Sequence, residues 1–145
     1  MDYYKLIKMH SREDAFSRLI GMHIVEVGNG TARTEMKING DHKNPIGSVH
    51  GGAIASLADI TGGAAAFSRG VRVTTLDSSI HYLRPGINTS CLYGISHELK
   101  RGHRVSVYEV TITDQDDVVL ATAIYTYMTL GLYDPDEEEK EQKEE

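Results

Sequence analysis

The segment Asn44–Gly52 combines residue types that could bind a carbonyl or phosphate oxygen. It reads NPIGSVHGG, a loop of small residues that runs directly into an Ala-rich stretch from Gly51 to about Ser68. The first N–H groups of a helix have no partner within the helix and carry partial positive charge. Small residues let an oxygen approach these donors, so the segment suits an oxyanion hole. The same glycines could serve only to let a helix pack closely on a sheet.

Asp59 is the only charged residue between Lys43 and Arg69. The residues three and four positions away on either side carry no charge: Ala55, Ser56, Gly62 and Gly63. Asp59 therefore has no ion-pair partner on its own helix. An aspartate in this setting faces water, pairs with a distant residue, or lies in a cleft as a catalytic carboxylate. The neighbouring loop favours the third interpretation.

A third candidate for chemistry is a basic region between residues 69 and 105. It holds only two acidic residues against six basic ones: Arg69, Arg72, Arg84, Lys100, Arg101 and Arg104. Guanidinium groups bind phosphates well, so the region would suit a polyphosphate such as the nucleotide end of coenzyme A. A turn with solvated charges is the alternative interpretation.

Other reaction centres lack the residues that they need. The single cysteine, Cys91, excludes an internal disulfide and a CxxC motif, and its apolar strand indicates a core position. The histidines do not show the spacing of a zinc site, and no G-x-S-x-G elbow is present. The chain also has no Walker loop, no dinucleotide fingerprint and no nucleic-acid-binding motif. We therefore predict no metal and no nucleic-acid partner.

The elements that position these residues can be predicted from periodicity and turn residues. An amphipathic helix is expected over 3–20, ended by Gly21, and strands over 22–28 and 31–38, joined by an Asn29-Gly30 turn. In the first strand, Val25 and Val27 alternate with polar or small residues. A loop over 39–50 leads into a long helix over 51–68. Four further strands are expected, over 72–84, 88–99, 103–113 and 117–130.

The long strands with tight connections predict an antiparallel meander packed on a single long helix. This is an α+β architecture of the hotdog type, in which a curved antiparallel sheet wraps around one central helix. The four glycines at positions 51, 52, 62 and 63 lower the intrinsic stability of that helix by about 1 kcal/mol each where they lie inside it. Something other than helix propensity must hold the helix in place.

Length and charge predict one domain with an acidic extension. The chain has 145 residues, 40% of them hydrophobic, and a net charge of −6, which is typical of an ordinary globular domain. Residues 134–145 carry all of that net charge, so residues 1–133 are neutral. We predict a single domain over 1–133 and a solvated, disordered tail over 134–145. No apolar run reaches the length of a membrane span, and we expect a cytoplasmic protein without a membrane partner.

The segment 44–59, NPIGSVHGGAIASLAD, resembles the signature of the hotdog-fold acyl-CoA thioesterases of the phenylacetate-pathway (PaaI-type) branch. That signature has an Asn six residues before the His of an HGG triplet and an Asp nine residues after that His. The resemblance continues through TTLDSSIHYLRPG at 74–86 and through the last two strands, and it covers roughly residues 14–130.

This resemblance implies a role for each matching residue in an acyl-CoA thioesterase. Asp59 would be the catalytic carboxylate, either a nucleophile or a general base on water. The Gly51 N–H would polarise the thioester carbonyl, and Asn44 would position the water or the thioester. His50 would support the loop, and Thr75 would help to hold the attacking water.

The resemblance also implies how the substrate is bound. The phosphates of coenzyme A would contact the basic residues, in particular Arg84, Lys100, Arg101 and Arg104. The small residues at 62–66 would leave room for a bulky or aromatic acyl group. No separate cofactor is implied, because coenzyme A is part of the substrate.

In such enzymes each site lies between two subunits, one giving Asp59 and Thr75 and the other giving Asn44, His50 and Gly51. A homodimer is therefore implied, commonly paired into a dimer of dimers. One alternative is a non-catalytic acyl-CoA binding or sensing module, which would not need the carboxylate of Asp59. A hotdog dehydratase acting on hydroxyacyl thioesters is another, with His50 as its catalytic histidine.

Overall fold

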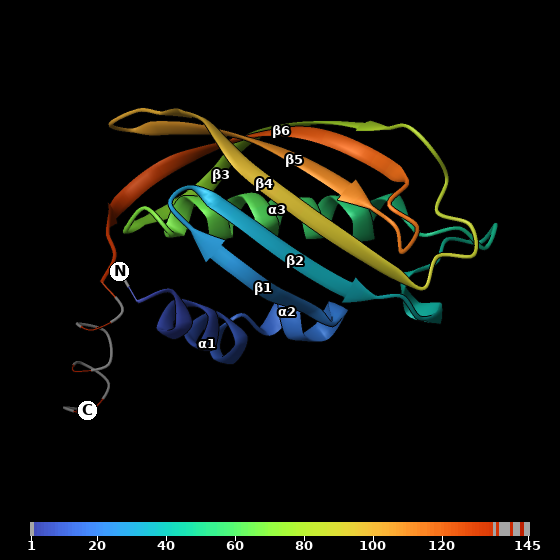
Figure 1. Cartoon of the computed structure of the whole chain (residues 1–145), viewed down its shortest axis with the longest axis horizontal. Coiled ribbons are helices and arrows are strands. Elements are labelled where there is room, and N and C mark those ends of the chain that lie inside the picture. The colour runs from blue at the N-terminus through green and yellow to red at the C-terminus, as the bar shows by residue number, and fades with distance from the viewer. Residues whose placement is uncertain (1, 135, 137–139, 141–142, 144–145) are drawn as a thin grey trace.

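All strands in the described part of the chain join one antiparallel sheet (Figure 1). The computed structural model describes residues 2–134, 136, 140 and 143. The six strands follow the spatial order β1-β2-β4-β5-β6-β3. Their bounds lie within three residues of those predicted: β1 (Met22–Gly28), β2 (Thr31–Lys37), β3 (Val71–Tyr82), β4 (Cys91–Arg101), β5 (Val105–Thr113) and β6 (Val119–Leu132).

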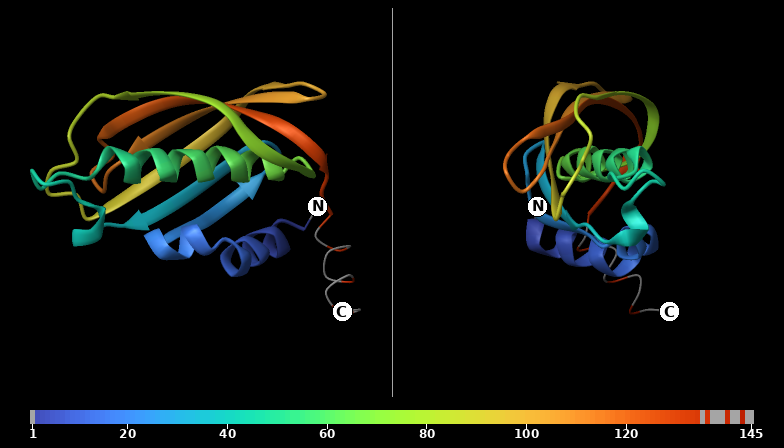
Figure 2. Two further views of the ribbon diagram at one scale, coloured as in Figure 1. Left: turned by 180° about the vertical axis from the view of Figure 1, so that it is seen from behind. Right: turned by 90° about the vertical axis from the view of Figure 1, so that its right-hand side faces the viewer.

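One long helix, α3 (Gly51–Phe67), lies along the concave face of this sheet, which curls around it (Figures 1 and 2). Its Ile54, Leu57 and Ala58, which lie at helical spacing, are all buried at 3% exposure or less. Burial of such side chains contributes about 1.5–3 kcal/mol for each large one, which offsets the weak propensity of the glycines. The predicted hotdog architecture, a curved antiparallel sheet around one central helix, is confirmed.

The predicted meander is wrong for one strand. β3 does not pair with β4, the next strand in the chain, but with β6 at the far edge of the sheet. The connection through α3 carries the chain from β2 across the concave face to that edge. In the resulting register, Thr75 of β3 lies opposite Tyr127 of β6. This pairing places both residues beside α3.

The N-terminal segment forms two helices rather than the single one predicted. The helices α1 (Tyr3–Glu13) and α2 (Ala15–Ile20) meet at Asp14, whose backbone leaves the helical region. The Asp14 carboxylate accepts hydrogen bonds from the Ser17 N–H at 3.0 Å and the Ser17 hydroxyl at 2.7 Å. Aspartate favours such an N-cap over a mid-helix position, so the chain turns here. The predicted end at Gly21 is confirmed, with a left-handed φ of 76°.

The first hairpin has the predicted turn but not the predicted alternation. Asn29 and Gly30 have φ values of 48° and 82°, as a tight hairpin turn requires. A bulge in β1 shifts the register between Ile24 and Glu26. Val25 is therefore 50% exposed, while Ile24 and Val27 face the core. The extra residue of a bulge breaks the period of two on which the prediction depended.

No helix in the described residues is long and apolar enough to span a membrane. The prediction of a disordered tail over 134–145 falls mostly on residues outside the described part of the chain. Of the residues there that are described, Asp136 accepts a hydrogen bond from the Lys5 ammonium group of α1.

Candidate active site

Asp59 finds its partner on β3. Its carboxylate Oδ1 accepts a hydrogen bond of 2.6 Å from the Thr75 hydroxyl. Asp59 is partly buried on α3, and Thr75 is exposed on the strand that follows it. The two residues are 16 positions apart, so no helical spacing could have shown the contact. The structure thus brings together the carboxylate and the hydroxyl that were singled out from the sequence.

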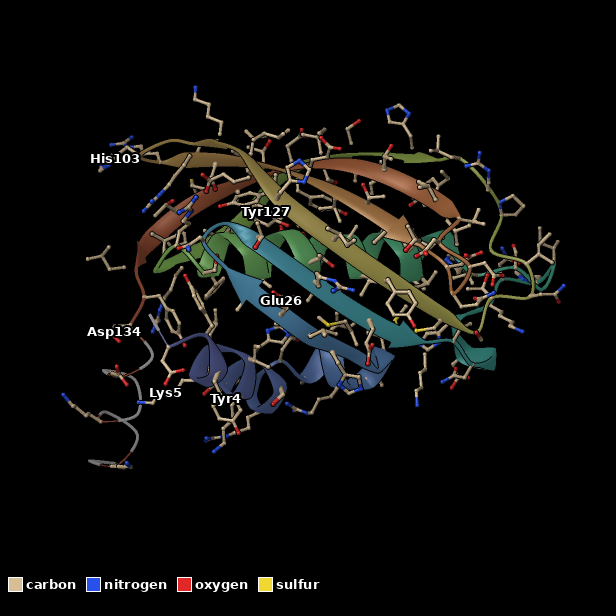
Figure 3. All side chains as sticks on the ribbon, viewed as in Figure 1. Tyr4, Lys5, Glu26, His103, Tyr127 and Asp134 are labelled. Atoms are coloured by element: carbon tan, nitrogen blue, oxygen red, sulfur yellow. The ribbon has the colours of Figure 1, made fainter. Side chains whose placement is uncertain are left out.

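Two tyrosines of β6 hold the backbone of α3 beneath Asp59. The Tyr127 hydroxyl donates a hydrogen bond of 2.7 Å to the Asp59 carbonyl, and the Tyr125 hydroxyl donates one of 3.0 Å to the Ala55 carbonyl. Figure 3 labels Tyr127 where the strands of the sheet overlie α3. Burial raises the pKa of both hydroxyls, and the charge of Asp59 raises it further, so both remain protonated donors. This support was not predicted from the sequence, although two tyrosines at alternating positions of a strand are a signal for it.

Tyr127 explains one of the glycines of α3, Gly62. A Cβ atom on Gly62 would lie 2.4 Å from the Tyr127 hydroxyl oxygen, which no real contact allows. A Cβ atom on Gly63 would lie 3.8 Å from the Tyr127 ring, an ordinary contact distance. Gly62 is therefore required by packing.

This difference gives a test by two matched substitutions. Gly62→Ala should destabilise the protein by about 1–3 kcal/mol, because the buried Tyr127 must move and its hydrogen bond to Asp59 is strained. Gly63→Ala should be neutral or stabilising by up to about 1 kcal/mol, because alanine favours the helix. Denaturant unfolding of both variants measures the two effects. Equal effects would mean that Tyr127 does not constrain the helix.

The start of α3 forms a second group of candidate residues. His50 caps the helix, and its Nδ1 accepts a hydrogen bond of 2.8 Å from the Gly52 N–H. In the described part of the chain, the Gly51 N–H has no hydrogen-bond acceptor. This free donor lies at the positive end of a helix of 17 residues. It can therefore bind an oxygen that develops negative charge.

Asn44 acts on the loop that precedes this helix. Its carbonyl Oδ1 accepts hydrogen bonds from the N–H groups of Ile46 at 3.2 Å and Ser48 at 3.1 Å. Its amide Nδ2 donates to the Ser48 hydroxyl at 2.7 Å. Gly47 completes the turn with a φ of 86°. Asn44 thus holds the loop in shape and keeps one amide hydrogen for another partner.

The two groups of candidate residues are separated within the chain. Gly51 and Asp59 are eight positions apart on one helix, which corresponds to about 12 Å along its axis. A reacting carbonyl group spans far less than this distance. The structure therefore joins Asp59 to Thr75, and Asn44 and His50 to Gly51, but it does not join the two groups to each other.

The four basic residues expected to meet coenzyme A also divide into two locations. Arg84 lies near Gly51 in a hollow of about 250 Å³, and its guanidinium donates to the Val119 carbonyl at 3.0 Å. Lys100, Arg101 and Arg104 lie around the β4–β5 turn, whose tip His103 marks in Figure 3. This turn is at the opposite end of the molecule from the start of α3 (Figure 1). The four residues do not form one cluster in a single chain.

A groove of about 670 Å³ lies beside the β4–β5 turn, with Arg101 and Arg104 in its lining. Arg69 lines the groove as well, but its guanidinium makes two hydrogen bonds to the Glu98 carboxylate, at 2.9 and 3.0 Å. Burial opposes the ionisation of Glu98, yet Arg69 and Tyr108 hold its pKa below the ordinary value. Arg69 is thus committed to this pair, and the exposed Arg101 and Arg104 are better placed to meet a phosphate.

A cavity of about 550 Å³ opens beside Asp59 and Thr75, between α1 and the second half of α3. It gives the carboxylate access to a ligand. A curved sheet around one helix, with a carboxylate on that helix facing a cavity, defines a hotdog-fold protein with an active-site candidate on its central helix.

Comparisons with known proteins agree with this class. Residues 46–121 match the model of the family described as the thioesterase superfamily. The acyl-coenzyme A thioesterase PaaI of Escherichia coli K12 is 29% identical over 108 residues, which are 74% of this chain and 77% of that protein. The chain therefore belongs to the thioesterase superfamily, as the resemblance implied, and it is a thioester hydrolase of the PaaI-like type.

Solved structures show the same fold. The structure of the E. coli PaaI protein from the phenylacetic acid degradation operon has a TM-score of 0.85 at 24% identity, over 90% of this chain and 95% of that one. A hypothetical thioesterase from Streptococcus pneumoniae TIGR4, solved with coenzyme A, has a TM-score of 0.80 at 27% identity. The match covers 88% of this chain and 99% of that one.

Proposed function

We propose that this protein hydrolyses acyl-CoA thioesters to a free acid and coenzyme A, at sites that are each completed by two chains. The observation that carries the proposal is the Thr75–Asp59 pair, which faces an open cavity on the central helix. The S. pneumoniae thioesterase was solved with coenzyme A, which supports coenzyme A as the thiol that is released. A module that only bound acyl-CoA would have no use for a carboxylate at this position.

Asp59 can act in either of two ways on the thioester carbon. As a general base it takes one proton from a water molecule, whose oxygen then attacks the carbon. The Thr75 hydroxyl donates to Asp59, so its lone pairs can accept the second hydrogen of that water. As a nucleophile, Asp59 would form an anhydride that water then hydrolyses. In the general-base route the C–S bond then breaks, and the leaving thiolate takes the proton that Asp59 removed from water. In the nucleophilic route the C–S bond breaks as the anhydride forms. Hydrolysis of the anhydride by water then releases the acid, restores Asp59 and supplies the proton for the thiolate.

The oxyanion would be stabilised by Gly51 of the partner subunit. Gly51 of the same chain as Asp59 lies about 12 Å from Asp59 along the helix. It is therefore too far away to contact the carbonyl group that Asp59 reaches. A helix N–H donor of this kind is worth about 3 kcal/mol of transition-state stabilisation. Asn44 and His50 would maintain the loop and cap around this donor. The separation of the two groups thus favours a shared site.

We assign the outer edge of β3 as the surface that contacts a second copy of this chain. β3 is the last strand of the sheet, so its outer edge is unpaired in the described chain. Three large apolar residues at this edge are exposed by 53–57%: Leu76, Tyr82 and Leu83. An exposed strand edge with apolar side chains favours pairing with another strand. We propose a homodimer through this edge, paired in turn into a dimer of dimers, which light scattering would measure.

Release of free thiol from a panel of acyl-CoA esters tests the proposed function directly. Turnover with coenzyme A and free acid as products is the expected result. Tight binding of the same esters without thiol release would instead identify a non-catalytic acyl-CoA module. Loss of water from a hydroxyacyl ester, without thiol release, would identify a dehydratase.

Charge reversal at the β4–β5 turn should weaken binding of the nucleotide end of the substrate. Arg101→Glu or Arg104→Glu should raise KM for a CoA ester by about tenfold, while kcat changes little, because phosphate contacts are equal in the ground and transition states. KM for a short pantetheine thioester should be nearly unchanged. Steady-state kinetics with both substrates measure this difference.

Arg33→Glu provides a matched control, since Arg33 is an exposed arginine on β2, away from the turn. It should leave both KM values unchanged. Equal weakening of both substrates by the Arg101 and Arg104 variants would show that the turn is not the nucleotide site.

A further inference from the structure

The cavity beside Asp59 extends well beyond the reacting atoms. It follows α3 from Asp59 past Ile60 and Gly63 to Phe67. These eight positions correspond to about 12 Å along the helix. Thioester hydrolysis needs only the end at Asp59 and Thr75. The remaining length is free to receive the acyl group.

The walls of this extension are mainly apolar and come from three elements. Leu6 and Met9 of α1, Phe67 of α3 and Val73 of β3 line it. Gly63 lies one turn beyond Asp59 and contributes no side chain, so the passage next to the carboxylate stays open. An elongated cavity whose walls are mainly apolar can bind a hydrocarbon chain.

The charged residues of the lining oppose an anionic ligand. Three carboxylates face the cavity, those of Glu13, Asp14 and Asp59, against the single guanidinium of Arg72. Burial lowers the pKa of His10, more than Asp14 raises it, so this histidine is neutral near pH 7. An acyl group with a terminal carboxylate would therefore be repelled.

α1 is held in place by core packing and by hydrogen bonds at its C-terminal end. Leu6 is only 2% exposed and belongs to the core. At the α1–α2 corner, the Ser17 hydroxyl lies 2.7 Å from the Asp14 carboxylate and 3.2 Å from His10 Nε2. This partly buried cluster fixes the end of α1 against the cavity. A side chain on α1 can thus limit what the cavity accepts.

We propose that α1 forms the outer wall of the acyl pocket and that Met9 sets the size of the acyl group. The pocket takes uncharged, elongated acyl groups, longer than acetyl, that run from Asp59 toward Phe67. This inference rests on the proposed function and adds the class of acyl group to it. The sequence alone left that class open.

Hydrolysis of a homologous series, from acetyl-CoA to decanoyl-CoA, tests the pocket. In the wild-type protein kcat/KM should rise by about fourfold for each methylene that is buried, until the pocket is filled. Succinyl-CoA should be hydrolysed at least about tenfold more slowly than butyryl-CoA, which has the same number of acyl carbons. A preference for acetyl-CoA or for succinyl-CoA would overturn the proposal.

Two substitutions of Met9 should move the optimum in opposite directions. Met9→Phe fills the pocket, and we expect a shorter optimum with about a tenfold loss for the longest ester that the wild type accepts. Met9→Ala enlarges the pocket and should lengthen the optimum. Lys8→Ala, on the exposed face of the same helix, should leave the profile unchanged.

Thermal unfolding identifies any variant that fails to fold. If one Met9 variant does not fold, the other one tests whether Met9 sets the size of the acyl group. An unchanged chain-length profile in a folded Met9 variant would overturn the role of α1 while leaving the thioesterase activity intact. Absence of thiol release from every ester in the wild-type protein would overturn the proposed function instead.

Discussion

Replacing Asp59 by Asn should lower kcat by about 10²–10⁴-fold, the range typical of a lost general base. The amide has nearly the same shape, and its oxygen can still accept the 2.6 Å hydrogen bond from Thr75. It can neither take a proton from water nor attack the thioester carbon. The fold and oligomeric state should therefore persist while turnover is lost. Thiol-release kinetics and thermal unfolding measure the two properties separately.

Asp116→Asn is the matched control for this substitution. Asp116 is an exposed aspartate in the β5–β6 turn, far from α3 along the chain. The same change of charge at this position should leave kcat unaffected. A near wild-type rate for Asp59→Asn would remove Asp59 from the chemistry and leave the cavity as a binding site only.

Mixing two inactive variants should restore activity if each site is shared between chains. Asp59→Ala lacks the carboxylate, and Asn44→Ala lacks the side chain that holds the loop before Gly51. A hybrid dimer would contain one site in which both groups are intact. With random pairing of equal amounts, about one quarter of the wild-type activity is expected. A brief unfolding and refolding of the mixture lets the subunits exchange before the assay.

Each variant refolded alone serves as the control and should remain inactive. Subunits that carry different affinity tags show directly that hybrids have formed. If verified hybrids recover no activity, both groups must act within one chain. That result would contradict the separation of about 12 Å between Gly51 and Asp59 along the helix.

Local signals account for the parts of the fold that were predicted correctly. The Asn29-Gly30 turn depends on two residues that tolerate positive φ. The beginning of α3 depends on His50, whose cap involves the residue two positions further on. The apolar face of α3 follows from helical spacing alone. In each case the interacting residues are neighbours in sequence, so their types and order are enough.

Two of the errors come from competition between local patterns. The apolar residues on both sides of Asp14 follow one helical period, but the Asp14 side chain favours a helix N-cap. The cap prevails because Ser17 supplies two hydrogen-bond donors to the Asp14 carboxylate. Val25 fits an alternating strand until the bulge adds a residue. Neither outcome can be read from periodicity, since periodicity assumes an uninterrupted element.

The sequence by itself determined most of the elements, the curved sheet around a single helix, and the identity of the candidate residues Asp59, Gly51 and Asn44. Only the tertiary structure decided what surrounds Asp59. β3 lies beside β6 rather than β4, so Thr75 and Tyr127 become neighbours and both contact Asp59. Tyr127 is 68 positions from Asp59. Such contacts depend on which edge of the sheet a strand joins, and that choice is made by packing across the whole domain rather than by local propensity.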